Sequence, residues 1–291
     1  MVGEVIIRPP SEARSFLLPV TSGCSNNRCI FCGAYRDIRF RVRPLEEIKQ
    51  DIDEVAGHYG SGVRRVFLEN GDALIAPQPR LVAVLEYLHQ RFPHLERVAT
   101  YASPQSALTK SPEQLQALHR LGLQMAYLGV ETGDEALLQK VGKGVTYDQM
   151  VTAGRKLREA GIILSAMVIL GLGGVAGSRQ HALGTARILS DIDPEFTGAL
   201  TLMLVPGTPL YQEMEAGRFT PVSPFQALEE LRLIIQHARF SRCFFTANHA
   251  SNYLPIRARL PEQREAVLRT IEEVLAQQDI SRLRPEITRA L

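Results

Sequence analysis

The sequence predicts an α/β protein: a partial (β/α)6, TIM-like barrel followed by a mainly helical C-terminal extension. Short apolar runs alternate with helical hydrophobic spacing through about 210 residues, which favours parallel strands with helices outside them. Several of these runs end in glycine and acidic residues, at the strand end where such barrels keep their chemistry. A chain of 291 residues is long enough for one barrel of this size.

Hydrophobic periodicity places the elements in order along the chain. Strands are expected at residues 16–20, 63–68, 98–102, 125–130, 162–170 and 196–205. Between them, apolar residues at helical spacing predict helices at 44–57, 81–88, 115–121, 135–141, 147–160 and 178–190. We expect one structural unit, with a core barrel over residues 1–210 and an extension over 211–291 that closes it.

Composition narrows the class of protein. A hydrophobic content of 45% with 22% charged residues is typical of a soluble globular protein. The net charge of +2 is too small to indicate nucleic acid or membrane binding. No stretch resembles a secretory signal or a membrane span, so we expect a cytoplasmic location. Arginines alternate with apolar residues over 37–44, which favours a solvated strand edge over an anion site.

Three of the four cysteines, Cys24, Cys29 and Cys32, lie in one loop directly after the first predicted strand. Three thiolates in a loop indicate a soft metal, either zinc or iron–sulfur. With Cys243 as a distant fourth ligand, the spacing Cys-x4-Cys-x2-Cys suits a ferredoxin-type cluster or a zinc site. Without Cys243, the three loop cysteines bind three irons of a four-iron cluster and leave the fourth iron free for a small molecule. The apolar surroundings of Cys243 are typical of an inert buried thiol and favour the three-ligand interpretation.

The cysteine loop and several strand-end motifs resemble the radical S-adenosylmethionine (SAM) superfamily. An aromatic residue, Phe31, precedes the third cysteine as in that family, although the family's usual spacing is Cys-x3-Cys-x2-Cys. The strand ends look most like the branch with oxygen-independent coproporphyrinogen oxidase, the Elongator catalytic subunit and the methylthiotransferases. The resemblance covers residues 16–209.

The resemblance implies that the three loop cysteines ligate a [4Fe–4S] cluster and that strand-end residues bind SAM. The implied SAM contacts are Phe31, Asn70, Gly71, Asp72, Ser103, Glu131, Lys143, Leu170 and Val205. Without the resemblance, Asp72 and Glu131 also suit ordinary loop carboxylates or helix N-caps, and Lys143 suits a solvated surface lysine.

The resemblance further implies an enzyme in which the reduced cluster cleaves SAM to methionine and a 5′-deoxyadenosyl radical. It also implies a flavodoxin- or ferredoxin-type electron donor. We expect a small or medium-sized metabolite as the substrate. An iron–sulfur electron-transfer protein is the alternative from another class. RNA modification is a further alternative, which the methylthiotransferase-like motifs and the arginines at 36–43 suggest, although the sequence shows no RNA-binding appendage, second cysteine motif or cobalamin domain.

On the substrate side, a polar loop at 248–255 supplies three candidate catalytic residues, His249, Asn252 and Tyr253. His and Tyr side chains relay protons or quench radicals. The other interpretation is a loop that docks the last helix. Tyr35, three residues after Cys32, is another candidate that aromatic packing explains equally well.

Overall fold

The apolar runs of the sequence form a mostly parallel sheet in the computed structural model, which describes residues 8–290. The eight strands in chain order are β1 (Phe16–Pro19), β4 (Arg65–Glu69), β5 (Arg97–Ala102), β6 (Leu123–Glu131), β7 (Ile163–Leu170), β8 (Phe196–Thr201), β9 (Cys243–Thr246) and β10 (Arg257–Leu260). Their order in the sheet is the same as their order in the chain, and β10 pairs antiparallel with β9. Two short strands, β2 (Thr21–Ser22) and β3 (Arg41–Val42), pair separately.

The described residues divide into two compact units, one of residues 8–27, 34–128 and 153–164, the other of 28–33, 129–152 and 165–290. In the first unit, β1, β4, β5 and β6 pair in parallel, with Phe16 opposite Val66 and Val66 opposite Val98. Its helices are α1 (Leu45–Tyr59), α2 (Gln78–Arg91), α3 (Pro104–Thr109) and α4 (Pro112–Arg120), with the one-turn 3-10 helices η1 (Pro10–Glu12), η2 (Gly60–Gly62) and η3 (Ala73–Ile75).

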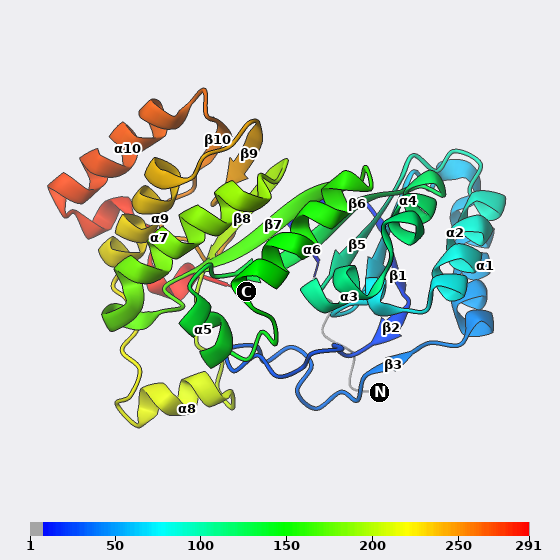
Figure 1. The fold of residues 1–291 in the computed structure, drawn as a ribbon, viewed down its shortest axis with the longest axis horizontal. Coiled ribbons are helices and arrows are strands. Elements are labelled where there is room, and N and C mark those ends of the chain that lie inside the picture. Colours follow the sequence, from blue (N-terminus) through cyan, green and yellow to red (C-terminus); the bar gives the residue numbers. More distant parts are fainter. Residues whose placement is uncertain (1–7, 291) are drawn as a thin grey trace. The chain divides into compact units, whose positions relative to one another are not determined.

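Apolar side chains at helical spacing bury one face of each main helix in this unit. Helix α1 buries Ile48 and Ile52, and α2 buries a stripe that includes Leu81 and Leu88. The two helices lie side by side in Figure 1, as their amphipathic faces predict. Ser103 is the N-cap residue of α3, and its hydroxyl accepts a hydrogen bond from the backbone N–H of Ser106 in a capping box.

In the second unit, β8 pairs in parallel with both β7 and β9, and β10 completes the edge. Helix α7 (Gly174–Ile192) lies beside α9 (Pro224–His237), and α9 lies beside α10 (Arg264–Gln277), at the upper left of Figure 1. The helices of this unit are α5 (Glu135–Lys140), α7 (Gly174–Ile192), α8 (Pro209–Glu215), α9 (Pro224–His237) and α10 (Arg264–Gln277), with η4 (Ile280–Arg282) and η5 (Glu286–Thr288). Helix α6 (Tyr147–Glu159) contributes residues to both units.

The α/β class, the mostly parallel sheet and the helical C-terminal region are confirmed. Some boundaries differ: β8 ends at Thr201 rather than at residue 205, and α3 and α8 were not expected. The apolar stretch at 243–246 is strand β9, which extends the sheet. In the arginine segment, only Arg41–Val42 is a strand, and Arg43 pairs with Asp51 at 2.5 Å.

The division into residues 1–210 and 211–291 stays a prediction. Among residues 8–290, no helix has the length and apolar character needed to cross a bilayer.

Candidate functional site

In the first unit, Cys24 lies in the loop after β2 and directly against Gly71, which follows β4. The N–H of Gly71 donates to the carbonyl of Gly23 at 3.2 Å, and the Cys24 Sγ lies 3.9 Å from the Gly71 carbonyl. A Cβ atom at Gly71 would lie 2.6 Å from the Cys24 Cβ, closer than side chains approach one another. The close approach of the cysteine loop to this strand end therefore requires glycine at position 71.

Asp72 holds the cysteine loop to the end of β5. Its side chain is fully buried and accepts three hydrogen bonds: from the Ser25 hydroxyl at 2.6 Å, the Ser103 hydroxyl at 2.6 Å and the Ser103 N–H at 3.0 Å. Asn70 adds a brace, since its Nδ2 donates to the Thr21 carbonyl at 2.7 Å. Ser25 is adjacent to Cys24, so the Asp72 carboxylate fixes the backbone that carries this thiol.

In the second unit, Cys29 and Cys32 form a turn that backbone hydrogen bonds hold in place. The N–H of Cys32 donates to the Cys29 carbonyl at 3.2 Å, and the N–H of Ile30 donates to the Val141 carbonyl at 3.0 Å. Ile30 and Phe31 pack against an apolar cluster whose buried members are Val141, Leu172, Leu210 and Phe219. This packing leaves Phe31 half-buried, between Cys29 and Cys32 in the chain.

Val205 lies against Gly33, directly after Cys32. A Cβ atom at Gly33 would lie 2.8 Å from the Val205 Cγ1. Leu170, the last residue of β7, is buried, and its carbonyl accepts a hydrogen bond from the Leu202 N–H at 2.8 Å. Leu170 at the end of β7 and Val205 after β8 are therefore two apolar residues at strand ends of the second unit.

Glu131 and Lys143 form a mostly buried ion pair at the end of β6. The Lys143 Nζ lies 2.8 Å from the Glu131 Oε1, with side-chain exposures of 10% and 13%. Glu131 adopts a left-handed backbone (φ 65°), which is uncommon for a residue other than glycine and clusters at functional sites. Gly129 makes room for the pair, because a Cβ atom there would lie 2.3 Å from the Glu131 Oε1 and 2.8 Å from the Lys143 Nζ.

A buried histidine and a buried carboxyl brace the loops after β6 and β7. The His181 Nε2 donates to the Ile169 carbonyl at 2.9 Å, so its Nδ1 accepts from the Thr132 hydroxyl at 2.8 Å. Burial lowers the pKa of His181 to about 4, which keeps the ring neutral at pH 7. Glu230 accepts from the Gly171 N–H and the Ser178 hydroxyl, both at 2.6 Å. Burial raises the pKa of Glu230 to about 7, although these hydrogen bonds oppose the shift.

Sequence analysis did not single out His181 or Glu230. The available signal was a polar residue on the apolar face of an amphipathic helix, in α7 and in α9 respectively. Such a residue is buried with its face and has to find hydrogen-bond partners there.

Asn252 and His249 both serve the internal structure of the 248–255 loop. Asn252 is buried, accepts from the Thr201 hydroxyl at 2.8 Å and donates to the Ala199 carbonyl at 2.9 Å, which ties the loop to β8. The Nδ1 of His249 accepts from the Ser251 N–H at 3.1 Å. Burial, and after it the charge of Arg284, lowers the pKa of His249.

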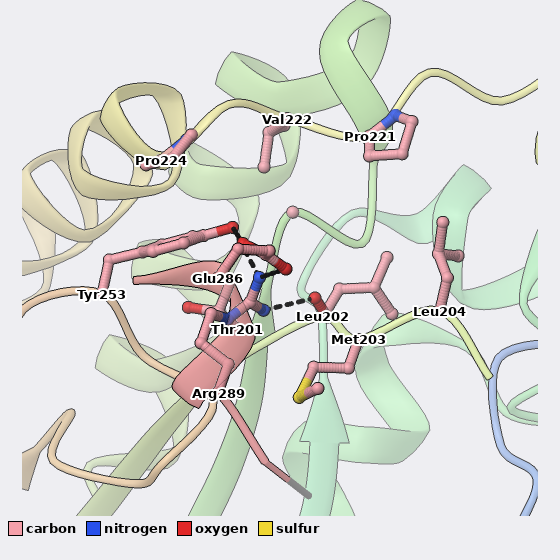
Figure 2. Close-up of a pocket in the computed structure, with 11 residues that line it drawn as sticks. Thr201, Leu202, Met203, Leu204, Pro221, Val222, Pro224, Tyr253, Glu286 and Arg289 are labelled. Atoms are coloured by element: carbon pink, nitrogen blue, oxygen red, sulfur yellow. Dashed lines mark hydrogen bonds and ion pairs between the residues drawn. The ribbon is translucent and has the colours of Figure 1, made fainter. Parts of the chain in front are cut away.

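Tyr253 differs from these two residues because it lines a cavity of about 430 Å³ in the second unit. The walls come from the loops after β7 and β8, from the segment before α9 and from the C-terminal tail (Figure 2). The lining residues are Gly171, Thr201, Leu202, Met203, Leu204, Pro221, Val222, Pro224, Tyr253, Glu286 and Arg289. The tail residues Glu286 and Arg289 were not predicted, because nothing local in the sequence links them to strand ends far away in the chain.

The donor set of the cysteine loop fits a thiolate-bound iron–sulfur cluster. The three loop cysteines are half-buried thiols outside any disulfide, whereas Cys243 is buried, and burial raises its pKa to about 12. Such a thiol does not readily supply a thiolate ligand. Within residues 8–290, no three His, Cys, Asp or Glu side chains are gathered as ligands of a single metal ion. The assignment of a cluster therefore depends on donor chemistry and on relatives, not on a preformed cage.

Comparison with known proteins identifies relatives for more than half of the chain. The family model of the Radical SAM superfamily matches residues 18–181. An uncharacterised protein of Methanopyrus kandleri is 30% identical over 145 residues, which are 46% of this chain and 27% of that protein. The heme chaperone HemW of Bacillus subtilis is 22% identical over 197 residues, 65% of this chain and 51% of that protein.

Among solved structures, the coproporphyrinogen III oxidase HemN of Escherichia coli, a radical SAM enzyme, shares the fold. The TM-score is 0.58 at 15% identity, covering 76% of this chain and 51% of that one. The chain spans about a quarter to about a half of the length of the two curated relatives described.

Proposed function

Because the chain belongs to the Radical SAM superfamily, whose members are enzymes that use a [4Fe–4S] cluster and SAM, we propose that Cys24, Cys29 and Cys32 hold this cluster. The protein would then be a radical SAM enzyme acting on a small or medium-sized metabolite. The observation that carries the proposal is the loop of three half-buried thiols, with Cys24 fixed against Gly71, which follows β4.

When bound at the cluster, SAM supplies a 5′-deoxyadenosyl radical and methionine. The chain's own residues would bind and orient the cofactor. The Glu131 carboxylate suits the ammonium end of the methionine moiety, and the Lys143 ammonium suits its carboxylate. These two side chains hold one another at 2.8 Å, so they are orientated before the cofactor arrives.

Apolar residues complete the proposed cofactor site. Phe31, Leu170 and Val205 suit the flat adenine ring, and with the ring bound they would help to keep water from a reactive radical. Asp72 and Ser103 also remain proposed SAM contacts. Their mutual hydrogen bonds support a second role, in which they keep the cysteine loop in place.

The main alternative is an iron–sulfur protein that only transfers electrons. The chemistry of Cys243 argues against the four-cysteine form of this alternative, since its Sγ lies 3.3 Å from the Thr197 hydroxyl in a buried site. The Glu131–Lys143 pair supports SAM binding further, because an electron-transfer site has no need for it. RNA modification is a weaker alternative, suggested only by the arginines at 36–43 and by the methylthiotransferase-like strand-end motifs.

Partners follow from the proposed reaction. A flavodoxin- or ferredoxin-type protein would donate the electron, and a small molecule would be the substrate.

The test is anaerobic incubation of the reconstituted, reduced protein with SAM, followed by quantification of 5′-deoxyadenosine and methionine. We expect both products to form in the wild type and neither in Cys29→Ala. A reconstituted protein that carries iron and sulfide but leaves SAM intact would favour the electron-transfer alternative.

A further inference from the structure

Two donors at the cavity of the second unit converge on a single carboxylate. The Tyr253 hydroxyl donates to the Glu286 Oε2 at 2.7 Å, and the Arg289 Nη1 donates to the Glu286 Oε1 at 2.5 Å (Figure 2). Each carboxylate oxygen thus receives one donor, one neutral and one cationic. This arrangement recognises the two oxygens and the single charge of a carboxylate.

The donors are fixed by contacts that do not involve Glu286. The Arg289 Nε donates to the Ser251 carbonyl at 2.7 Å, and its Nη2 donates to the Leu202 carbonyl at 2.9 Å. The guanidinium carbon also lies 4.2 Å from the centre of the Tyr253 ring. The Arg289 side chain is only 3% exposed, so its position is set by the surrounding structure.

Glu286, in contrast, reaches the site from outside. Its side chain is 70% exposed and lies on the one-turn helix η5 of the C-terminal tail. Desolvation acts to raise the pKa of Glu286, but the hydrogen bonds from Arg289 and Tyr253 hold it below its usual value. An exposed carboxylate that binds a fixed, buried pair of donors is the arrangement expected when a side chain of the protein occupies the place of a ligand's carboxylate.

The rest of the cavity wall is largely apolar. Leu202, Met203 and Leu204, which follow β8, face Pro221 and Val222, and Arg289 is the only cation among the described residues that line the cavity. Leu202 and Leu204 also pack against the apolar cluster that contacts Phe31, which lies between Cys29 and Cys32. One cation and two donors suit a monoanionic carboxylate better than a doubly charged phosphate, which requires more donors.

We propose that this cavity binds the substrate, a small molecule with a carboxylate on an apolar body, and that the carboxylate replaces Glu286 between Arg289 and Tyr253. The proposal rests on the proposed function, since it takes the cavity as the substrate site of the same enzyme. Glu286 then competes with the substrate and leaves the donors when the substrate binds.

Two probes of equal shape test the proposal: 4-phenylbutyrate and its neutral amide, titrated by calorimetry into the cluster-loaded protein under anaerobic conditions. Glu286→Gln removes the competing charge, so we expect it to bind the acid about tenfold more tightly than the wild type does, with no change for the amide. The exposed Glu262 provides a matched control, and Glu262→Gln should bind both probes as the wild type does.

Variants of the donors should have the opposite effect. Arg289→Gln should bind the acid no better than the amide. Tyr253→Phe keeps the ring and should lose about three- to tenfold for the acid alone, which protects the test if Arg289→Gln folds poorly. Equal binding of acid and amide by Glu286→Gln, or weaker acid binding by that variant, would overturn the proposal.

The same preparation is assayed for 5′-deoxyadenosine, which separates the two claims. Protein that cleaves SAM but binds both probes alike overturns only the carboxylate proposal. Protein that prefers the acid but leaves SAM intact contradicts only the proposed radical SAM function.

Discussion

Substituting Gly129 by alanine separates cofactor binding from folding. The new Cβ would lie 2.3 Å from the Glu131 Oε1 and 2.8 Å from the Lys143 Nζ, so the ion pair has to move. Both clashing atoms are at the ends of flexible side chains, whereas the backbone around Gly129 needs no change. We therefore expect Gly129→Ala to fold and to retain its cluster while SAM binding weakens.

The size of the effect follows from the geometry of the pair. A hydrogen bond to a charged group contributes about 1.5–3 kcal/mol, and each 1.4 kcal/mol is about a factor of ten in affinity. Glu131 and Lys143 are mostly shielded from water, so little screening reduces this contribution. Displacing one such contact should weaken SAM binding by about 10- to 100-fold.

The assay is equilibrium binding of SAM to the reconstituted protein, with iron content and thermal unfolding measured on the same sample. The matched control is Gly57→Ala, because a Cβ atom at Gly57 in α1 meets nothing within 4 Å. This control should bind SAM normally and gain up to about 1 kcal/mol of stability. Unchanged SAM affinity in Gly129→Ala would refute the assignment of the ion pair to the cofactor site.

The remaining predictions concern metal retention, the support of the loop and pH. Alanine at any loop cysteine should remove the cluster, whereas Cys243→Ala should keep about four iron ions per chain. Asp72→Ala removes the acceptor of three hydrogen bonds, two of them buried, so we expect a stability loss of about 3 kcal/mol and poorer iron retention, measured by chemical unfolding and iron analysis. Burial raises the pKa of Glu230 to about 7 from its ordinary 4.5, so the folded protein binds a proton that the unfolded chain has released. Stability should therefore fall by about 3 kcal/mol from pH 4.5 to 7 relative to Glu230→Gln. The lowered pKa of His181 raises stability between pH 4 and 6.5 in both proteins, so it largely cancels in the difference. If the stability of Glu230→Gln falls with pH as steeply as that of the wild type, the raised pKa does not belong to Glu230.

Hydrophobic periodicity was enough to predict the alternation of strands and helices, because each strand and each amphipathic helix buries a local pattern of side chains. The prediction of elements failed where one local signal fits two structures. A Ser-Pro pair such as Ser103-Pro104 is typical of the end of a strand, here β5, but the same two residues also cap and begin α3. The apolar run at 243–246 has no sequence pattern that distinguishes a buried strand, which it forms, from a loop packed against the barrel.

The candidate site was predictable where a motif is continuous in the chain. The cysteine loop and the motifs that contain Gly71 and Glu131 are of this kind. The pairing of Glu131 with Lys143 and the joint contact of Tyr253, Glu286 and Arg289 were not predictable, because they depend on segments that only the fold brings together.

The central claim is that the three-cysteine loop holds a cluster at which SAM binds directly. Electron paramagnetic resonance of the reduced, reconstituted protein tests this claim, with spectra recorded before and after addition of SAM. We expect a [4Fe–4S] signal whose g-values change on SAM addition in the wild type and in Cys243→Ala. An unchanged spectrum at saturating SAM, or loss of the signal in Cys243→Ala, would contradict it.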